Sequence, residues 1–283
     1  MLFRSFRQTR QRSPIASSHP EAFVLTLWTN DPCVAQWADD AGVDRIGVDL
    51  ERHGKHARQC GRATWISPHT VMDLRRIRTA VRRAALFARL NPLGEATRDE
   101  LESVLDAGVS VVMLPMVADA SEVRRFVDLL DGRAVAVLLV ERREALDNLP
   151  ALVMVPGVGE VHFGLNDLAL SLGLSNRWST LAGDVLERAC ACVRAAGVPF
   201  GFGGIGRAFD EALPIPSDLV YAEYARLGAT RALVARSFGV SGEASVAREI
   251  RRARARLSSW RLMPDTDLCA AHAELQRCVA AAA

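Results

Sequence analysis

From residue 23 onward, short apolar runs alternate with longer amphipathic stretches along the chain. The runs are rich in Val, Leu and Ile and lack a period-two alternation, which is typical of parallel strands buried on both faces. Eight such runs occur, at residues 23–28, 45–50, 84–90, 109–116, 134–140, 160–164, 198–202 and 231–235. The pattern therefore predicts eight parallel strands.

The stretches between the runs carry helix signals. Helices are predicted at residues 31–41, 97–107, 119–130 and 181–196. A glycine follows each of them within two residues, as is common where helices end. Thr97 and Glu100 have the spacing of a capping box at the start of the second. Strands alternating with helices over residues 23–240 predict a (β/α)8 TIM barrel.

An open, doubly wound sheet is the alternative architecture. Such sheets bind dinucleotides through a glycine-rich turn after the first strand, and the chain has no such turn there. Its glycine cluster at residues 201–206 follows the seventh run instead. We interpret this cluster as a glycine-lined rim of the barrel rather than as a cofactor loop.

Two further segments flank the predicted catalytic barrel. Residues 1–22 hold four arginines and no acid before Glu21, without the apolar core of a secretory signal. We expect a disordered basic tail in a cytoplasmic protein, with a transit peptide as the alternative. Residues 241–283 predict a helical extension interrupted by Pro264, and its arginine run at 251–256 indicates a solvated or subunit-contacting face.

Composition and charge narrow the function classes. The 35 basic residues nearly balance the 33 acidic ones, so the net charge of +2 argues against a nucleic-acid partner. No apolar run reaches the roughly 18 residues of a membrane span. Lys55 is the only lysine, so a Schiff-base mechanism has one candidate residue in the whole chain.

Charged residues end several of the predicted strands. Active sites of such barrels lie at the carboxyl ends of the strands. Glu141 ends the fifth run and Asp167 follows the sixth, and adjacent strands lie about 4.8 Å apart. Two converging carboxylates suit a hard divalent cation. The alternatives are a salt bridge of Glu141 to Arg142 or another rim arginine, and an Asp167 that caps the following helix.

Arg89 ends the third run and is expected to point into the barrel mouth. Its planar fork can bind a carboxylate or an enolate oxygen. The alternative is a structural partner of Glu51, which lies near the end of the second run, or of Glu141.

At these positions the chain resembles the HpcH/HpaI aldolase and citrate lyase β-subunit family over residues 23–240. The resemblance rests on the order and spacing of six features: the turn 41–44, the strand end 48–51, Arg89, the segment 107–117, the pair 140–141 and the segment 164–173.

The resemblance implies a divalent metal held at Glu141 and Asp167, with Mg²⁺ expected and Mn²⁺ or Co²⁺ as alternatives. It also implies that Arg89 holds the keto-acid oxygen and stabilises an enolate, while Glu51 orients water or Arg89. The expected substrate contacts are Arg89, Pro115, Asn166 and Asp167. Family members often form trimers or hexamers, so a homo-oligomer is expected, with residues 242–259 packing on a neighbouring subunit.

The chain departs from the family pattern at two positions. Pyruvate aldolases of the family carry a histidine where this chain has Arg52, and a glutamine where it has Leu139. We therefore expect His53 or His56, acting through water and Asp49, to move the proton. The basic loop 52–59 either recognises an anionic substrate or is simply solvated.

The sequence thus predicts a metal-dependent carbon–carbon lyase of the class II aldolase type. It would act through an enolate of pyruvate or a related α-keto acid. A citrate-synthase-like or acyl-CoA condensing enzyme is one alternative, and a non-catalytic barrel that binds keto acids is another.

Overall fold

The computed structural model describes residues 22–53, 68–210, 213–235, 238–239 and 242–282. Its eight strands form one closed parallel barrel, in which sequence neighbours pair and β8 returns to β1. The strands are β1 (Val24–Trp28), β2 (Arg45–Asp49), β3 (Ala85–Arg89), β4 (Val111–Leu114), β5 (Val135–Val140), β6 (Val158–Phe163), β7 (Phe200–Ile205) and β8 (Arg231–Val234). The predicted (β/α)8 barrel is confirmed.

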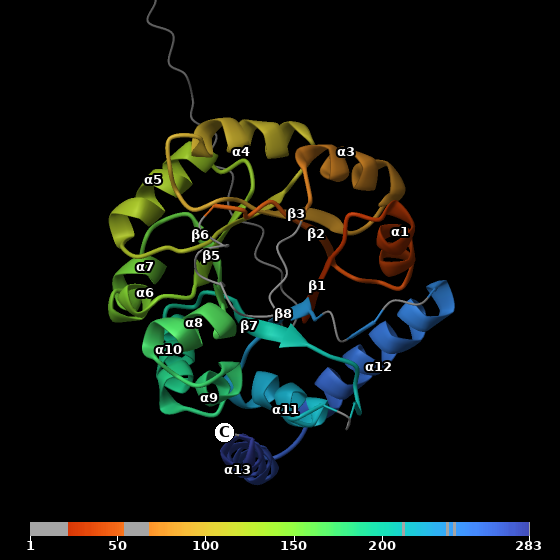
Figure 1. The fold of residues 1–283 in the computed structure, drawn as a ribbon, viewed down its shortest axis with the longest axis vertical. Helices are drawn as coiled ribbons and strands as arrows, with labels where there is room; N and C mark the ends of the chain where they lie inside the picture. The colour runs from red at the N-terminus through yellow and green to blue at the C-terminus, as the bar shows by residue number, and fades with distance from the viewer. Residues whose placement is uncertain (1–21, 54–67, 211–212, 236–237, 240–241, 283) are drawn as a thin grey trace, which may run out of the picture.

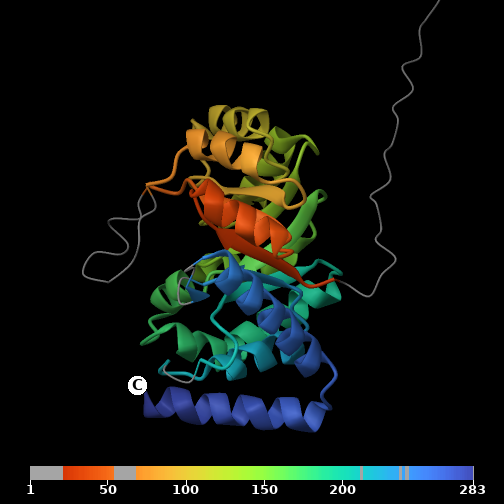
Figure 2. The same cartoon turned by 90° about the vertical axis from the view of Figure 1, so that its right-hand side faces the viewer.

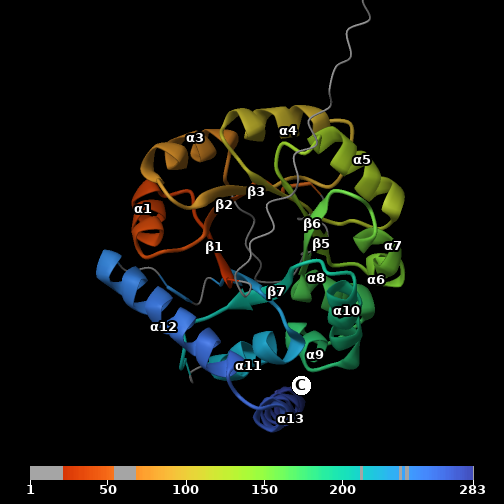
Figure 3. The ribbon, with the colours of Figure 1, turned by 180° about the vertical axis from the view of Figure 1, so that it is seen from behind.

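Helices surround the barrel as an outer layer, as both end-on views show (Figures 1 and 3). They are α1 (Pro32–Asp40), α3 (Val71–Ala80), α4 (Thr97–Asp106), α5 (Ala120–Leu130), α6 (Arg143–Asp147), α7 (Leu149–Val153), α8 (Leu165–Leu172), α9 (Arg177–Leu181), α10 (Asp184–Ala195), α11 (Ser217–Leu227), α12 (Glu243–Arg261) and α13 (Asp265–Ala281).

The start of α4 differs from the predicted capping box. The Thr97 hydroxyl accepts a hydrogen bond from the Gly94 amide at 2.8 Å, upstream of the helix. The Glu100 carboxylate binds the side-chain amide of Asn91 rather than a helix amide. Both polar side chains therefore fix the turn after β3, because tertiary partners replace the local ones that the spacing predicts.

Apolar side chains fill part of the inside of the barrel. A compact inner cluster forms from Phe87, Val111, Met113, Val137 and Leu139, separate from the larger core between the strands and the helices. This packing agrees with the general rule that such barrels are solid inside and place their chemistry at the strand ends.

The C-terminal helices pack on their own chain. Contacts join α12 to α1 and α11, and α13 to α11, and Figure 2 shows α13 running across the outer side of the molecule. Arg254 pairs with Asp44 at 2.7 Å, and Arg256 pairs with Asp218. Arg254 and Arg256 therefore tie α12 to the barrel, while Arg251 and Arg252 are exposed, and a solvated or subunit-contacting face stays a prediction for these two. Within the described residues, no helix has the length and apolarity that crossing a membrane requires.

A buried ion cluster lies inside the barrel near the amino ends of β2 and β8. Glu160 is 5% exposed; it accepts two hydrogen bonds from Arg45 at 2.6 Å and one from Arg231 at 2.8 Å. The two guanidinium groups hold the pKa of Glu160 below its usual value, against the opposing effect of burial. The carboxylate is therefore ionised at neutral pH and joins three strands.

We predict that Glu160→Ala lowers the free energy of unfolding by about 3–5 kcal/mol, because it leaves two buried guanidinium groups without their anion. Urea denaturation followed by circular dichroism measures this loss. The control is Glu102→Ala, which removes an exposed partner of Arg133 and should leave stability nearly unchanged. Equal, small effects of both substitutions would contradict the prediction.

Candidate active site

An arginine–carboxylate cluster lies where β2 and β3 end. The parallel register places Asp49 directly beside Arg89. Arg89 Nε and Nη2 donate to the two carboxylate oxygens of Asp49 at 2.8 and 2.6 Å, and Nε lies 3.4 Å from Glu51 Oε2. These carboxylates keep the pKa of Arg89 above its usual value although burial opposes this. The guanidinium is therefore a fixed cation in the barrel mouth.

Glu141 follows β5 and is 3% exposed. Its Oε1 accepts a hydrogen bond from the Met116 amide at 3.0 Å, and Met116 adopts a left-handed φ of 59°. Burial raises the pKa of Glu141 to about 8; Arg89 opposes the rise, and Asp167 and Glu51 add to it. The surroundings of Glu141 therefore supply too little positive charge to offset the burial of its carboxylate.

The alternative that paired Glu141 with Arg142 is wrong, because Arg142 Nε faces Glu144 at 3.3 Å. The alternative that made Asp167 a helix cap is also wrong. Helix α8 begins at Leu165 with Gly164 as its N-cap, so Asp167 belongs to the first turn.

The Asp167 side chain contributes the second carboxylate. Its Oδ1 is buried and has no hydrogen-bond partner among the described residues. Buried carboxylate oxygens ordinarily find a partner, so this atom is suited to bind a cation. The described residues contain no group of three or more His, Cys, Asp or Glu side chains arranged around one ion. Glu141 and Asp167 therefore offer two protein ligands, which suits an ion that keeps waters and accepts substrate oxygens.

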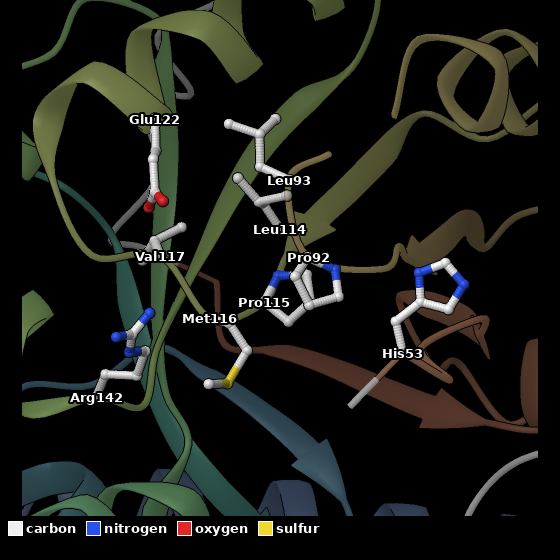
Figure 4. Close-up of a pocket in the computed structure, with 9 residues that line it drawn as sticks. All are labelled: His53, Pro92, Leu93, Leu114, Pro115, Met116, Val117, Glu122 and Arg142. Carbon is white, nitrogen blue, oxygen red and sulfur yellow. The ribbon is translucent and has the colours of Figure 1, made fainter. Parts of the chain in front are cut away.

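A cavity of about 400 Å³ opens beside this cluster, between the ends of β3, β4 and β5 (Figure 4). It is lined by His53, Pro92, Leu93, Leu114, Pro115, Met116, Val117, Glu122 and Arg142. Met116 lines the cavity, and its backbone amide donates the hydrogen bond to Glu141. The predicted contact residue Pro115 lies in the wall, whereas Asn166 is exposed in the first turn of α8.

The predicted histidines separate in the structure. His53 lines the cavity, and its backbone amide donates to Asn91 Oδ1 at 3.0 Å. His56 lies outside the described residues. The sequence analysis missed His69, whose Nδ1 accepts from the Asp49 amide at 3.2 Å. Arg52 donates to the His69 carbonyl at 2.7 Å, so it clamps this segment beside β2. No spacing signal joins His69 to Asp49, since the two residues are 20 positions apart in the sequence.

Comparisons with known proteins identify the family of this chain. The family model described as HpcH/HpaI aldolase/citrate lyase matches residues 23–203. The chain belongs to the HpcH/HpaI aldolase/citrate lyase family. This membership makes it a carbon–carbon lyase of the aldolase type, and it implies a divalent metal.

The curated relatives of this family member include the 2-keto-3-deoxy-L-rhamnonate aldolase of Klebsiella pneumoniae subsp. pneumoniae. It is 28% identical over 222 residues, which cover 66% of this chain and 76% of the relative. Among solved structures, the HpcH/HpaI aldolase of Desulfitobacterium hafniense DCB-2 matches with a TM-score of 0.59 at 17% identity, covering 86% and 95% of the two chains. The citrate synthase SbnG matches with a TM-score of 0.56 at 16% identity, covering 84% and 95%. These two structures show the shared fold.

Gly164 leaves room for the Glu141 side chain, which is the first of the two expected metal ligands. A Cβ atom on residue 164 would lie 2.8 Å from Glu141 Oε2 and 2.9 Å from Glu141 Cβ. We predict that Gly164→Ala displaces the Glu141 carboxylate and weakens Mn²⁺ binding about tenfold or more, since the ligand itself must move. Isothermal titration with Mn²⁺ measures the change.

The matched control is Gly94→Ala, where the nearest atom to an added Cβ is Pro92 O at 3.8 Å. This variant should bind Mn²⁺ like the wild type. Equal affinity in both variants would show that residue 164 does not constrain the site.

Proposed function

We propose that the enzyme forms or cleaves the carbon–carbon bond next to the carbonyl of pyruvate or a closely related α-keto acid, and that Mg²⁺ is its metal. The observation that carries this proposal is the buried Glu141 carboxylate, which is influenced by both the Arg89 guanidinium and Asp167, together with the unpartnered, buried Oδ1 of Asp167. Anionic ligands and a fixed cation at one barrel mouth suit a substrate whose carboxylate and keto oxygens bind a metal. The keto-acid name of the Klebsiella relative supports the same substrate class.

In the condensation direction, a proton leaves the methyl carbon of the keto acid for a base. That carbon then bonds to the aldehyde carbon, whose oxygen takes up a proton; cleavage is the reverse. Glu141 and Asp167 would hold the divalent ion, which would supply Lewis-acid polarisation of the keto oxygen. The chain itself must supply the position of the substrate, charge stabilisation and the proton route.

Arg89 is the group that stabilises negative charge as the enolate develops. Its guanidinium is 19% exposed and is held in one orientation by both oxygens of Asp49. A donor fixed in advance in a water-poor site needs no reorganisation during the reaction. Asp49 therefore positions Arg89, and because both of its oxygens bind the guanidinium, it is poorly suited to accept a proton.

We assign the proton transfer to His53, which lies on the cavity wall at the barrel mouth. His162 is unsuited to this role. It is 3% exposed inside the barrel, its Nε2 lies 3.0 Å from the Gly203 carbonyl oxygen, and burial lowers its pKa to about 4. His56 stays a second candidate from the sequence.

We further propose that the enzyme acts in the cytoplasm as a homo-oligomer, a trimer or hexamer, without nucleic-acid or membrane partners. The net charge of +2 supports the absence of a nucleic-acid partner. Analytical ultracentrifugation of the full chain tests the assembly.

Exchange of the pyruvate methyl protons in heavy water tests the proposed chemistry without any aldehyde. We predict exchange with Mg²⁺ that is lost with EDTA and in Glu141→Ala and Asp167→Ala. We also predict that it survives in Lys55→Arg, because a guanidinium does not form the Schiff base; Lys55 lies outside the described residues. Exchange that resists EDTA, or a borohydride-trapped adduct on Lys55, would overturn the proposal.

We predict that Arg89→Lys lowers turnover about 10²–10³-fold although the charge is retained, because lysine cannot contact Asp49 and the enolate oxygen at once. Turnover and melting temperature are measured together on the purified variant. The control is Arg133→Lys, which alters a similar two-pronged pair with Glu102 on the surface. Near-wild-type turnover with a lowered melting temperature would make Arg89 a structural residue.

A further inference from the structure

Beyond the end of β2, a side chain holds the backbone in place of a neighbouring strand. The backbone amides of Arg52 and His53 both donate to one atom, Asn91 Oδ1, at 2.9 and 3.0 Å. Asn91 lies two positions after Arg89, just past the end of β3. A single side chain therefore joins the segments that follow two adjacent strands at the barrel mouth.

Glu100, in the first turn of α4, holds Asn91 in this orientation. One carboxylate oxygen accepts from the side-chain amide of Asn91, and the other accepts from its backbone amide at 3.4 Å. An ionised carboxylate only accepts hydrogen bonds, so Nδ2 of Asn91 must face Glu100 and Oδ1 must face residues 52 and 53. Helix α4 is itself anchored by the buried side chains of Leu101 and Val104. Asn91 is therefore oriented by a helix that packs against the barrel.

A second set of contacts holds the same segment from its other side. Arg52 Nη2 donates to the carbonyl oxygens of Pro68 and His69 at 3.1 and 2.7 Å, and His69 accepts from the Asp49 amide. Both Arg52 and His53 are exposed, so water could satisfy their amides without any protein partner. These contacts therefore order the segment rather than satisfy buried groups.

This ordered segment carries the histidine to which we assign the proton transfer. His53 comes two residues after Glu51, whose Oε2 lies 3.4 Å from Arg89 Nε. A general base must lie within hydrogen-bond reach of the proton that it removes, and a misplacement of about 1 Å can cost roughly 10²-fold in rate. A base on an exposed segment therefore needs its backbone to be fixed by other residues.

We propose that Asn91 and Glu100 are positioning residues for the proton transfer. Glu100 orients Asn91, Asn91 fixes the backbone of residues 52 and 53, and this backbone sets where the His53 ring lies relative to Arg89. This inference rests on the proposed function and adds to it two residues that influence the reaction only through His53.

Exchange of the pyruvate methyl protons, measured over a range of pyruvate concentrations, tests the inference. Asn91→Ala should lower kcat for exchange about 10–100-fold, as expected for a misplaced catalytic group. KM for pyruvate and the affinity for Mn²⁺ should stay close to wild type, because the Asn91 side chain binds Glu100 and the backbone of residues 52 and 53. The matched control is Asn148→Ala, which removes one side-chain hydrogen bond to the Ala118 carbonyl elsewhere on the surface and should exchange like the wild type.

A double-mutant cycle decides whether Asn91 acts through His53. His53→Ala should lower exchange strongly, and adding Asn91→Ala should cause no further loss, because the group that Asn91 positions is already absent. Losses that multiply in the double variant would contradict the inference, since Asn91 would then affect exchange by another route.

Exchanging the polarity of the Asn91–Glu100 pair provides a rescue test. Asn91→Asp keeps an acceptor for the two amides but places a second carboxylate against Glu100, so exchange should fall. Adding Glu100→Gln restores a donor toward residue 91, and most of the lost rate should return. A double variant that is as slow as Asn91→Asp alone would contradict the inference, and this test does not require Asn91→Ala to fold.

The outcomes separate this inference from the function on which it rests. The absence of exchange in the wild type would overturn the proposed function and this inference together. Wild-type exchange in His53→Ala would overturn the assignment of the base, and with it this inference, while the metal-dependent chemistry would stand. A strong loss in His53→Ala with wild-type exchange in Asn91→Ala would overturn only the inference. A loss of Mn²⁺ affinity in Asn91→Ala would also overturn it, because it would show a general structural role.

Discussion

At the barrel mouth, several buried carboxylates surround a single guanidinium, and its one positive charge does not balance theirs. Arg89 faces Asp49, Glu51 and Glu141, and Glu141 in turn is influenced by Asp167. Carboxylates removed from water are costly unless a cation or hydrogen bonds replace the solvent. A single arginine bound on two prongs to Asp49 cannot satisfy the rest. The uncompensated carboxylates are therefore suited to bind a further cation, which supports the proposed metal site.

The backbone is shaped to keep these groups close. The register of β2 and β3 sets the Arg89–Asp49 pair, whereas the approach of Glu141 depends on residues outside the strands. Gly164 gives it room, and Met116 turns its amide toward it from a left-handed conformation. A non-glycine residue with positive φ is uncommon and carries strain that the surrounding structure must offset. Here the strain coincides with a hydrogen bond to the proposed metal ligand.

The sequence predicted those parts of the site that strand order alone determines. Glu141, Asp167 and Arg89 each follow an apolar run, so barrel topology was sufficient to bring them to one end. The partners of these three residues were harder to predict from the sequence. Asp49 was expected as a proton route, but the register makes it the bidentate anchor of Arg89. His69 contacts Asp49 across a sequence separation of 20 residues, and no local pattern encodes such a contact.

The two ends of the barrel interior solve the problem of buried charge in opposite ways. At one end, Glu160 lies between Arg45 and Arg231, so the carboxylate is satisfied by protein groups and has a lowered pKa. At the mouth, carboxylates outnumber the guanidinium, and Glu141 has a raised pKa.

His162 lies under the influence of both Glu160 and Arg89, and it stays neutral near physiological pH because burial outweighs the attraction of Glu160. A neutral residue between the two clusters adds no charge to either. The Glu160 cluster, whose charges are paired, contributes to stability and leaves no charge to bind a ligand. The barrel mouth keeps unpaired negative charge, which a divalent ion requires. A second arginine at the barrel mouth would balance the charge of its carboxylates, and the mouth would then have no excess negative charge to attract a metal ion. The function proposed here therefore follows from where the barrel leaves its charge uncompensated.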